Sequence, residues 1–440
     1  MSQRSTSYTT AFIFLTSLFF LWGFITVLVD SLVPRIKDVF EMNYGRTILV
    51  QSAFFIAFFV VSLPAGVLLT KIGYKKGIVL GLCIMACGCL LFYPASEYRN
   101  FMVFMMGYFT LASGITIIQV AANPYVALLG SEEGASSRLN LSQAFNSLGT
   151  TIAPIIGALF LLSDSVKSSE EIEQLSETAK ANYYAAEAAT VQVPFLLIAG
   201  FIVVLGIIFA FINLPKVVQQ SPRGGYRSLL RNKGMMMGAL GIFLYVGAEV
   251  SIGSSFLVNY FKGMHLEHVI AESPVMIRIA NTIASIFNKT FSDADPKSLL
   301  GIFIIFYWGG AMIGRFIGAY LTRVIKPGKV LAVFALLAAS MVAISINTEG
   351  LVAMWSILAV GLFNSIMFPT IFTLTLDGLG TLKAQASGLL CMAIVGGAVV
   401  PYIFGNLIDF FGFKTAFALP LICYCYILFF GQTKALQHRY

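Results

Sequence analysis

Long apolar stretches, separated by shorter polar connections, recur from one end of the chain to the other. A helix that crosses the hydrocarbon core of a membrane needs about 20 mostly apolar residues, and most of these stretches reach that length. We expect membrane-spanning helices at residues 11–33, 48–70, 78–95, 101–129, 139–163, 194–214, 234–261, 299–322, 329–346, 351–376, 386–408 and 415–433. The pattern therefore predicts an all-α membrane protein with twelve transmembrane helices.

Three connections are longer than the others, and the middle one, 215–233, differs in charge. It carries five basic residues and no acidic residue. Basic segments are retained on the cytoplasmic side of a membrane. We therefore expect 215–233 to be a cytoplasmic linker between an N-terminal six-helix bundle, 1–214, and a C-terminal six-helix bundle, 234–440.

The other two long connections are 164–193 and 263–298. In the second, apolar residues between Met276 and Phe287 recur at helical spacing opposite Arg278 and Asn281. This spacing is typical of an amphipathic helix that lies at a membrane interface.

The two predicted bundles repeat each other in sequence. Small and helix-breaking residues recur at a separation close to 250 positions, which is the signature of a transporter built from structural repeats. The equivalent pairs are Gly66 with Gly318, Thr70 with Thr322, Gly149 with Gly396, Pro154 with Pro401 and Pro124 with Pro369. We expect two halves related by a pseudo-two-fold axis.

Composition and charge agree with a membrane protein and give its orientation. Hydrophobic residues make up 58% of the chain and charged residues 11%, with a mean hydropathy of +0.86. If both termini are cytoplasmic, sixteen basic and three acidic residues lie on that side, against eleven basic and fifteen acidic residues outside. This asymmetry predicts two cytoplasmic termini. The net charge of +8 forms no dense basic block, so we expect no nucleic-acid partner.

No pattern typical of an enzyme or a metal centre occurs in the sequence. A phosphate-binding loop is absent, so we expect no nucleotide hydrolysis. The six cysteines lie in apolar stretches and the three histidines in polar connections, and no nucleophile and base are arranged together. We expect no enzymatic activity and no cofactor, and the energy for transport must come from a gradient or from a partner.

Three ionisable residues lie inside predicted spans: Asp30, Glu249 and Arg315. Inserting an ionisable residue into the membrane core costs about 2.5–3.5 kcal/mol, so the presence of each one indicates a functional or structural role. Asp30 is either a carrier of the coupling ion or a solvated residue at the membrane interface. Glu249, in the middle of its span, is a candidate sugar ligand or ion carrier. Arg315 is a candidate gating residue or the structural partner of an acid.

Amide side chains form the most informative polar pattern. Gln119 and Asn123 share one helix face before Pro124, and Gln143 and Asn146 share a face of the next span. The repeat equates Gln119 with Asn364 and Asn123 with Phe368, which adds the candidate residues Asn364 and Phe368 in the second half. Amides donate and accept hydrogen bonds without charge, which suits an uncharged polyhydroxylated ligand. The alternative is hydrogen bonding between helices.

At these residues the sequence resembles the major facilitator superfamily, in its branch of fucose permeases and glucose/galactose permeases. The resemblance covers nearly the whole chain. It is carried by Leu18–Gly23, Asp30, Gln119–Tyr125, Arg138–Ser147, Tyr245–Ala248 and Phe368–Phe372. Thr70 departs from the superfamily, which usually has Asp there.

The resemblance implies a twelve-helix bundle with a central sugar site that works by alternating access, usually with proton coupling. It implies a coupling role for Asp30. The second acid of the fucose permease is replaced here by Gln119, and Glu249 stands where that permease has an amide. Fucose specificity is therefore in doubt, and the coupling ion is H⁺ or Na⁺.

These observations predict a symporter of a bacterial inner membrane that imports a neutral hexose. Glucose and galactose are the favoured substrates. We expect the sugar to contact Gln119, Asn123, Gln143, Asn146, Glu249, Asn364 and Phe368, and the ion to use Asp30 and Glu249. We expect the basic turns, which contain Lys71, Lys75 and Arg323, to gate the pathway. Arg315 is expected to gate it as well. We expect a monomer in the lipid bilayer. The alternatives are a fucose or N-acetylhexosamine symporter, an exporter of the same superfamily and a sugar sensor that does not transport.

Overall fold

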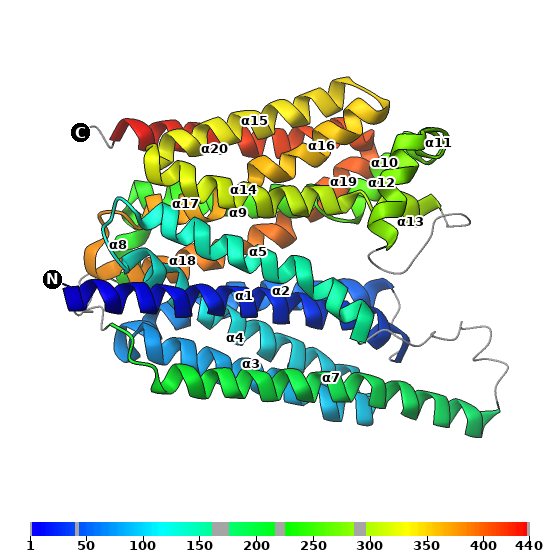
Figure 1. The fold of residues 1–440 in the computed structure, drawn as a ribbon, viewed down its shortest axis with the longest axis horizontal. Coiled ribbons are helices and arrows are strands. Elements are labelled where there is room, and N and C mark those ends of the chain that lie inside the picture. Colours follow the sequence, from blue (N-terminus) through cyan, green and yellow to red (C-terminus); the bar gives the residue numbers. More distant parts are fainter. Residues whose placement is uncertain (1, 40–43, 161–175, 216–224, 286–295, 438–440) are drawn as a thin grey trace.

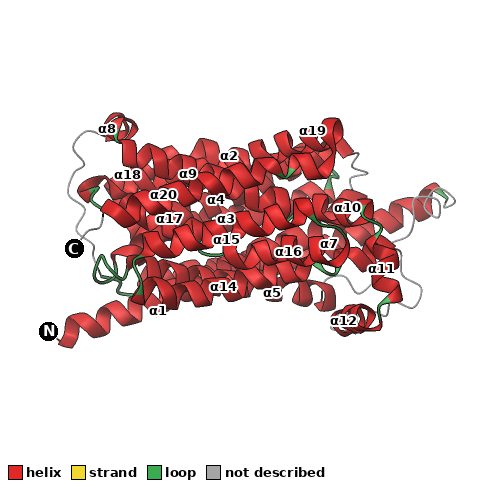
Figure 2. Ribbon diagram, turned by 90° about the horizontal axis from the view of Figure 1, so that it is seen from above, coloured by secondary structure: helices red, strands yellow, loops and turns green. Residues whose placement is uncertain are grey.

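The computed structural model describes residues 2–39, 44–160, 176–215, 225–285 and 296–437. Every regular element in these ranges is a helix (Figure 2). The first group of helices, which we call the N-terminal half, is α1 (Ser2–Val39), α2 (Tyr44–Ile72), α3 (Tyr74–Glu97), α4 (Phe101–Leu128), α5 (Ala135–Phe160) and α7 (Glu177–Phe211). Long helices of the second group, the C-terminal half, are α9 (Lys233–Ile252), α14 (Ile304–Val324), α15 (Pro327–Asn347), α16 (Gly350–Asn364), α19 (Gly396–Ala416) and α20 (Ala418–Gln437).

Shorter helices complete the C-terminal half and its connections. They are α8 (Gly225–Arg231), α10 (Ser255–Gly263), α11 (Leu266–Glu272), α12 (Pro274–Ser285), α13 (Pro296–Gly301), α17 (Met367–Leu376), η1 (Gly380–Leu382), α18 (Lys383–Met392) and η2 (Ala393–Val395). The start of α1 and the end of α20 lie at the same end of the molecule, with α8, on the left in Figure 1. We call it the terminal end. Helices α10–α13 lie at the opposite, far end.

Within the described residues, each of the twelve predicted spans coincides with one helix or with two or three consecutive helices, so the prediction of an all-helical membrane fold is confirmed. Eleven stretches within the described ranges are long and apolar enough to cross a membrane. Helix α5 is not among them, because serine, asparagine, glutamine and threonine recur along it. Large apolar side chains such as Leu197, Ile207 and Ile422 are exposed on the outside, where a lipid environment suits them.

The predicted span 351–376 is not one continuous helix. It divides into α16 and α17, with the break at Ser365 and Ile366. Pro369 lies in the first turn of α17 and has no N–H, so it cannot donate to the carbonyl of Ser365, four residues earlier. The break therefore leaves one backbone carbonyl available to a side chain.

The two halves meet along a seam formed by equivalent helices. Helix α5 packs against α14 and α17 of the other half, and α2 and α4 pack against α18. In Figure 1, α5 lies between α1 and α14, at the boundary between the N-terminal half, drawn from blue to green, and the C-terminal half, drawn from green to red. The span order makes these contacts symmetric: the second span meets the eleventh, and the fifth meets the eighth.

Two glycines that the sequence repeat equates have the same packing role. A Cβ on Gly149 of α5 would collide with the carbonyl oxygen of Phe20 in α1. A Cβ on Gly396 of α19 would likewise collide with the carbonyl oxygen of Phe243 in α9. Each glycine therefore allows two backbones of its own half to approach closely.

The predicted linker, 215–233, is partly described. Residues 216–224 lie outside the described ranges, and α8 follows them. Tyr226 of α8 donates a hydrogen bond of 2.6 Å to the carbonyl of Leu63 in α2. A Cβ on either Gly66 of α2 or Gly388 of α18 would collide with this hydroxyl. Tyr226 thus enters the seam between the halves, and burial raises the pKa of its hydroxyl, which stays protonated at neutral pH.

The predicted amphipathic helix in the connection 263–298 is present as α12. Met276 and Ile283 are buried, whereas Arg278 and Asn281 are exposed. Residues 286–295 lie outside the described ranges.

Candidate functional site

An ion pair is buried in the C-terminal half. The guanidinium of Arg315 on α14 lies 3.7 Å from the carboxylate of Glu249 on α9, and the two side chains are 14% and 12% exposed. Arg315 also donates through Nε to the Ser365 carbonyl, at 3.1 Å, and through a terminal nitrogen to the Ser147 hydroxyl of α5. One guanidinium therefore joins two helices of its own half to a helix of the other half.

Polar side chains from four helices surround this pair. Asn364 of α16 donates to the hydroxyl of Tyr307 on α14 at 2.6 Å, and that hydroxyl donates to the backbone carbonyl of Glu249 at 3.1 Å. Tyr245 of α9 and Tyr424 of α20 lie close enough to interact with the Glu249 charge.

Several buried polar atoms of this cluster have no hydrogen-bond partner within the protein. They are Glu249 Oε1, Asn364 Oδ1, Tyr245 Oη and Tyr424 Oη. Glu249 Oε1 still faces the Arg315 guanidinium in the ion pair. A buried polar atom without a hydrogen bond costs about 1–3 kcal/mol, so the other three atoms indicate a place for water, an ion or ligand hydroxyls. We call Tyr245, Glu249, Tyr307, Arg315, Asn364 and Tyr424 the charged cluster.

The amide residues of the N-terminal half form a neutral counterpart. Gln143 of α5 donates to the Asn123 side chain of α4 at 3.4 Å, and both residues are buried. The Asn123 Nδ2 has no partner within the protein. Asn146 donates to the carbonyl of Phe19 in α1 at 2.8 Å, so it also joins two helices. Gln119 is half-buried on α4.

Equivalent prolines each free a carbonyl that a side chain then binds. Pro124 cannot donate to Val120, and the hydroxyl of Ser387 on α18 donates to the Val120 carbonyl at 2.8 Å. Pro369 leaves the Ser365 carbonyl free for Arg315, as described above. The first contact is neutral and crosses the seam, whereas the second is charged and lies within the C-terminal half.

Neutral hydrogen bonds close the seam near the terminal end. The hydroxyls of Ser136 and Thr373 lie 2.6 Å apart, and Ser137 donates to the Ala319 carbonyl at 2.6 Å. The amide of Asn140 donates to the Thr370 hydroxyl at 3.1 Å. Each pair joins α5 to the other half, so the two halves are held together near the terminal end.

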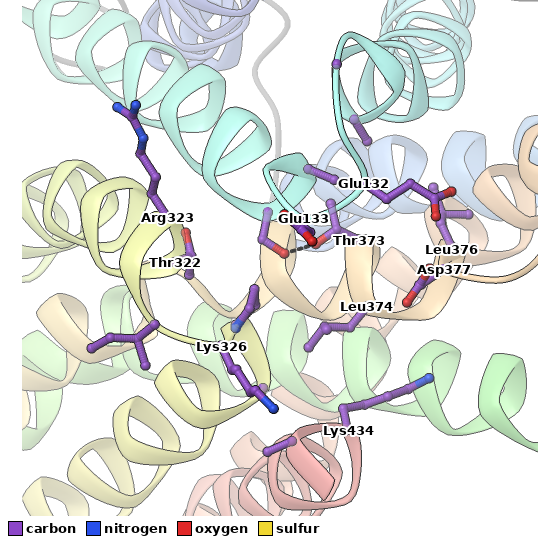
Figure 3. A pocket seen from close by; sticks show the side chains of 18 of the residues that line it. Glu132, Glu133, Thr322, Arg323, Lys326, Thr373, Leu374, Leu376, Asp377 and Lys434 are labelled. Carbon is purple, nitrogen blue, oxygen red and sulfur yellow. Dashed lines mark hydrogen bonds between the residues drawn. The ribbon is translucent and has the colours of Figure 1, made fainter. Parts of the chain in front are cut away.

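A cavity of about 600 Å³ lies at this closed end, between the two halves. Its N-terminal wall carries Glu132 and Glu133, and its C-terminal wall carries Lys326 and Lys434, as Figure 3 shows. At its edge, the carboxylate of Glu132 forms a salt bridge of 2.9 Å with Lys383. The lining contains no member of the charged cluster among the described residues, so this cavity is a vestibule at the terminal end.

The predicted gating residues have different surroundings. Lys75 donates to the Ala210 carbonyl at 2.8 Å, which caps the end of α7 within the N-terminal half. Lys71 is exposed at the end of α2, and Arg323 is exposed and lines the vestibule. Arg315 alone of these four joins the two halves by a described hydrogen bond.

Phe368 is buried, and its ring centroid lies 5.7 Å from that of Phe372, so it packs within α17. The side chain of Asp30 lies outside the part of the chain whose side chains are described. Its role in ion coupling stays a prediction.

Sequence reasoning did not select Tyr307, Tyr424 and Ser147 as site residues. A tyrosine or serine within an apolar span is common in helix packing, so its position gives no signal by itself. Ser147 and Tyr245 occur in the strings that carry the family resemblance, and this was the one available indication.

The arrangement offers hydrogen-bond donors and acceptors of the kind that suit an uncharged polar ligand. A neutral amide pair lies on one side of the seam and a charge-balanced cluster on the other, and Arg315 connects the second to α5. Unpartnered donors and acceptors are present in both.

Comparisons with known proteins agree on the family. The model of the Major Facilitator Superfamily matches residues 8–395. The glucose/galactose transporter of Brucella abortus (biovar 1, strain 9-941) is 48% identical over 420 residues, which cover 95% of this chain and 92% of that protein. The L-fucose-proton symporter of Escherichia coli K12 is 31% identical, over 98% of this chain and 94% of that protein. A crystal structure of FucP in the outward conformation has a TM-score of 0.85 at 30% identity, and covers 97% of this chain and 99% of that one.

Proposed function

The chain belongs to the Major Facilitator Superfamily, and from this premise we propose that it is a sugar symporter that imports glucose or galactose. The observation that carries this proposal is the pair of buried polar groups on the two sides of the seam, one neutral and one charge-balanced. The glucose/galactose transporters of Brucella abortus and Helicobacter pylori, 48% and 40% identical to this chain, support the choice of substrate.

The charge balance favours a neutral substrate over an ionic one. Glu249 and Arg315 neutralise each other, so the charged cluster offers no surplus charge to an acid or an amine. Amide, hydroxyl and carboxylate groups instead match the hydroxyls of a hexose, each of which donates and accepts. Drug exporters of the same superfamily would need a wider and more apolar site.

We propose that the structure represents the outward-facing state. The seam is closed at the terminal end, which the charge asymmetry of the sequence predicts to be cytoplasmic. Similarity to FucP in the outward conformation supports this assignment. We further propose that the protein lies in the inner membrane of a bacterium as a monomer. Both termini would lie in the cytoplasm.

Alternating access requires the closing contacts to be weak enough to break. A neutral hydrogen bond contributes about 0.5–1.5 kcal/mol net, so the bonds of Ser136, Ser137 and Asn140 together contribute a few kcal/mol. Conformational equilibria of this size leave both states populated. The halves can therefore rock around the buried residues once sugar and ion are bound.

The coupling ion is a proton or a sodium ion, carried by Asp30, Glu249 or both. Carboxylates suit either ion, since they take up protons and are hard oxygen ligands. The L-fucose-proton symporters among the relatives support a proton.

Uptake by the purified chain in proteoliposomes tests the proposed function. Radiolabelled glucose, galactose, fucose and N-acetylglucosamine would be supplied under a proton gradient, under a sodium gradient and without a gradient. We expect glucose and galactose to accumulate under one of the gradients. Preference for fucose or N-acetylglucosamine would support the alternative substrate classes. Saturable binding without flux would indicate a sensor, and absence of both binding and flux would refute the proposal.

A further inference from the structure

Arg315 occupies a special position among the contacts between the halves. Among the described side chains of α5, those that bond to the other half are Ser136, Ser137, Asn140 and Ser147. At a rise of about 1.5 Å per residue, Ser147 lies about 15 Å deeper in the membrane than Ser137. The contact between Ser147 and Arg315 is thus the deepest of the series, and it adjoins Asn146, a proposed sugar ligand.

Arg315 is also the cation that faces Glu249 within the described cluster. The titratable groups around this carboxylate are Tyr245 on α9 itself, Tyr307 and Arg315 on α14, and Tyr424 on α20. Helix α16 contributes the neutral Asn364. A cation that reaches Glu249 therefore competes with one described positive group, the Arg315 guanidinium.

Loss of this counter-ion has a direct consequence. A buried guanidinium without a carboxylate is unfavourable, although the Ser365 carbonyl and the Ser147 hydroxyl still accept two of its hydrogen bonds. Guanidinium groups have five N–H donors, so new acceptors are needed. Sugar hydroxyl oxygens beside Asn146 would supply them.

We propose that Arg315 couples cation uptake at Glu249 to sugar binding at α5. The cation, a proton or a sodium ion, displaces the guanidinium from the carboxylate, and the sugar accepts the hydrogen bonds that the guanidinium then has free. Each ligand makes the binding of the other more favourable, so the cation alone or the sugar alone binds weakly. Arg315 is a positioning residue in this scheme, and the inference rests on the proposed function.

The proposal is tested by measuring how sugar affinity depends on the cation. Purified, reconstituted full-length protein would be titrated with galactose and glucose at several pH values, with and without sodium. Binding linkage is reciprocal and is commonly five- to 150-fold. For the unaltered chain we expect the affinity to rise about tenfold or more with the coupling cation. The pH series and the sodium series distinguish the two ions.

Three variants and one matched control decide the role of Arg315. Glu249→Gln mimics the neutralised carboxylate and should bind sugar tightly at every cation concentration. Arg315→Gln should bind sugar weakly, without cation dependence. The double variant Glu249→Gln/Arg315→Gln should keep sugar counterflow, lose cation dependence and lose uphill accumulation. Ser137→Ala removes a neutral seam contact between the same helices, α5 and α14, and should keep the cation dependence of the unaltered chain.

Outcomes that contradict the proposal are distinct from failure of the proposed function. Cation-dependent affinity in Arg315→Gln like that of the unaltered chain would overturn it. If Arg315→Gln does not fold, Glu249→Gln decides, and retained cation dependence in that variant refutes the role of the pair. Absence of hexose binding and counterflow in the unaltered chain would instead refute the proposed function itself.

Discussion

Gly149 and Gly396 allow the same close helix approach in the two halves, whereas the buried polar pairs of the two halves differ. The N-terminal half has an amide pair, Gln143 with Asn123, and the C-terminal half has an ion pair, Arg315 with Glu249. Backbone packing has therefore been kept between the repeats while the chemistry has diverged. The comparison indicates that shape is shared by both halves, and that charge is concentrated in one described cluster.

The carbonyls of Val120 and Ser365 differ between the halves in the same way. Pro124 and Pro369 are equivalent, and each exposes the carbonyl four residues before it. A neutral hydroxyl binds the Val120 carbonyl across the seam, and a guanidinium binds the Ser365 carbonyl. The two equivalent carbonyls therefore accept hydrogen bonds from donors of different charge.

The largest expected effect tests whether the coupling ion needs an acid in the N-terminal half as well. Asp30→Asn should abolish uphill sugar accumulation, because an amide cannot take up the cation, and should leave sugar exchange in place. Accumulation and counterflow in proteoliposomes measure the two activities. Asp409→Asn, which removes an exposed aspartate of α19, is the control. Full accumulation by Asp30→Asn would restrict coupling to the C-terminal half.

The next effect compares the stability of the charged and neutral pairs. Arg315→Gln leaves the Glu249 carboxylate buried without its counter-ion, which should cost about 3–5 kcal/mol. Gln143→Ala removes a neutral hydrogen bond and should cost about 1 kcal/mol. Thermal unfolding in detergent measures both, and Glu249→Gln/Arg315→Gln should recover most of the loss. Equal losses in the two single variants would show that charge does not distinguish the halves.

A smaller effect tests the shared packing. Gly149→Ala and Gly396→Ala each place a methyl group against a backbone carbonyl of a neighbouring helix, and each should cost about 1–3 kcal/mol. The two losses should be similar, as measured by unfolding in detergent. Gly200→Ala on α7 meets no atom within 4 Å and should cause no loss. A large loss at one glycine alone would contradict equivalent packing.

The smallest expected effect concerns the linker. Tyr226→Phe removes the hydrogen bond to the Leu63 carbonyl but keeps the ring, so it should weaken closure of the terminal end by about 0.5–1.5 kcal/mol. A cysteine placed at Ser137 should then react with a water-soluble maleimide about two- to tenfold faster. Tyr98→Phe, at an exposed tyrosine of the far end, should not change the rate. An unchanged rate in Tyr226→Phe would exclude a role in closure.

The sequence predicted the helices well because each span must satisfy its own backbone in a stretch of fixed length. Paired glycines and prolines were also visible, since a repeat preserves spacing. The spacing did not show which groups bind the freed carbonyls. Ser387 lies far along the chain from Val120, and the seam brings the two together. Arg315 likewise lies far along the chain from Ser365, and the packing of α14 on α16 brings these two together.

The charged cluster was only partly predictable. Glu249 and Arg315 were recognisable because a charge inside a span is costly, and pairing with an acid was one of two alternatives for Arg315. Their pairing depends on the placement of α9 and α14 in the C-terminal half, where α16 contacts both helices. No local sequence pattern encodes this placement. Tyr307 and Tyr424 have apolar rings with one polar atom, so their sequence context is the same in a lipid-facing or a ligand-facing position.

The balanced Glu249–Arg315 pair also determines how transport would respond to voltage. The pair has no net charge, and a cation that joins it adds one positive charge within the membrane. Moving one elementary charge across a membrane potential of 100 mV changes its free energy by about 2.3 kcal/mol. At about 1.4 kcal/mol per factor of ten, this corresponds to roughly a fifty-fold concentration of an uncharged sugar. Import through such a site would produce an electric current.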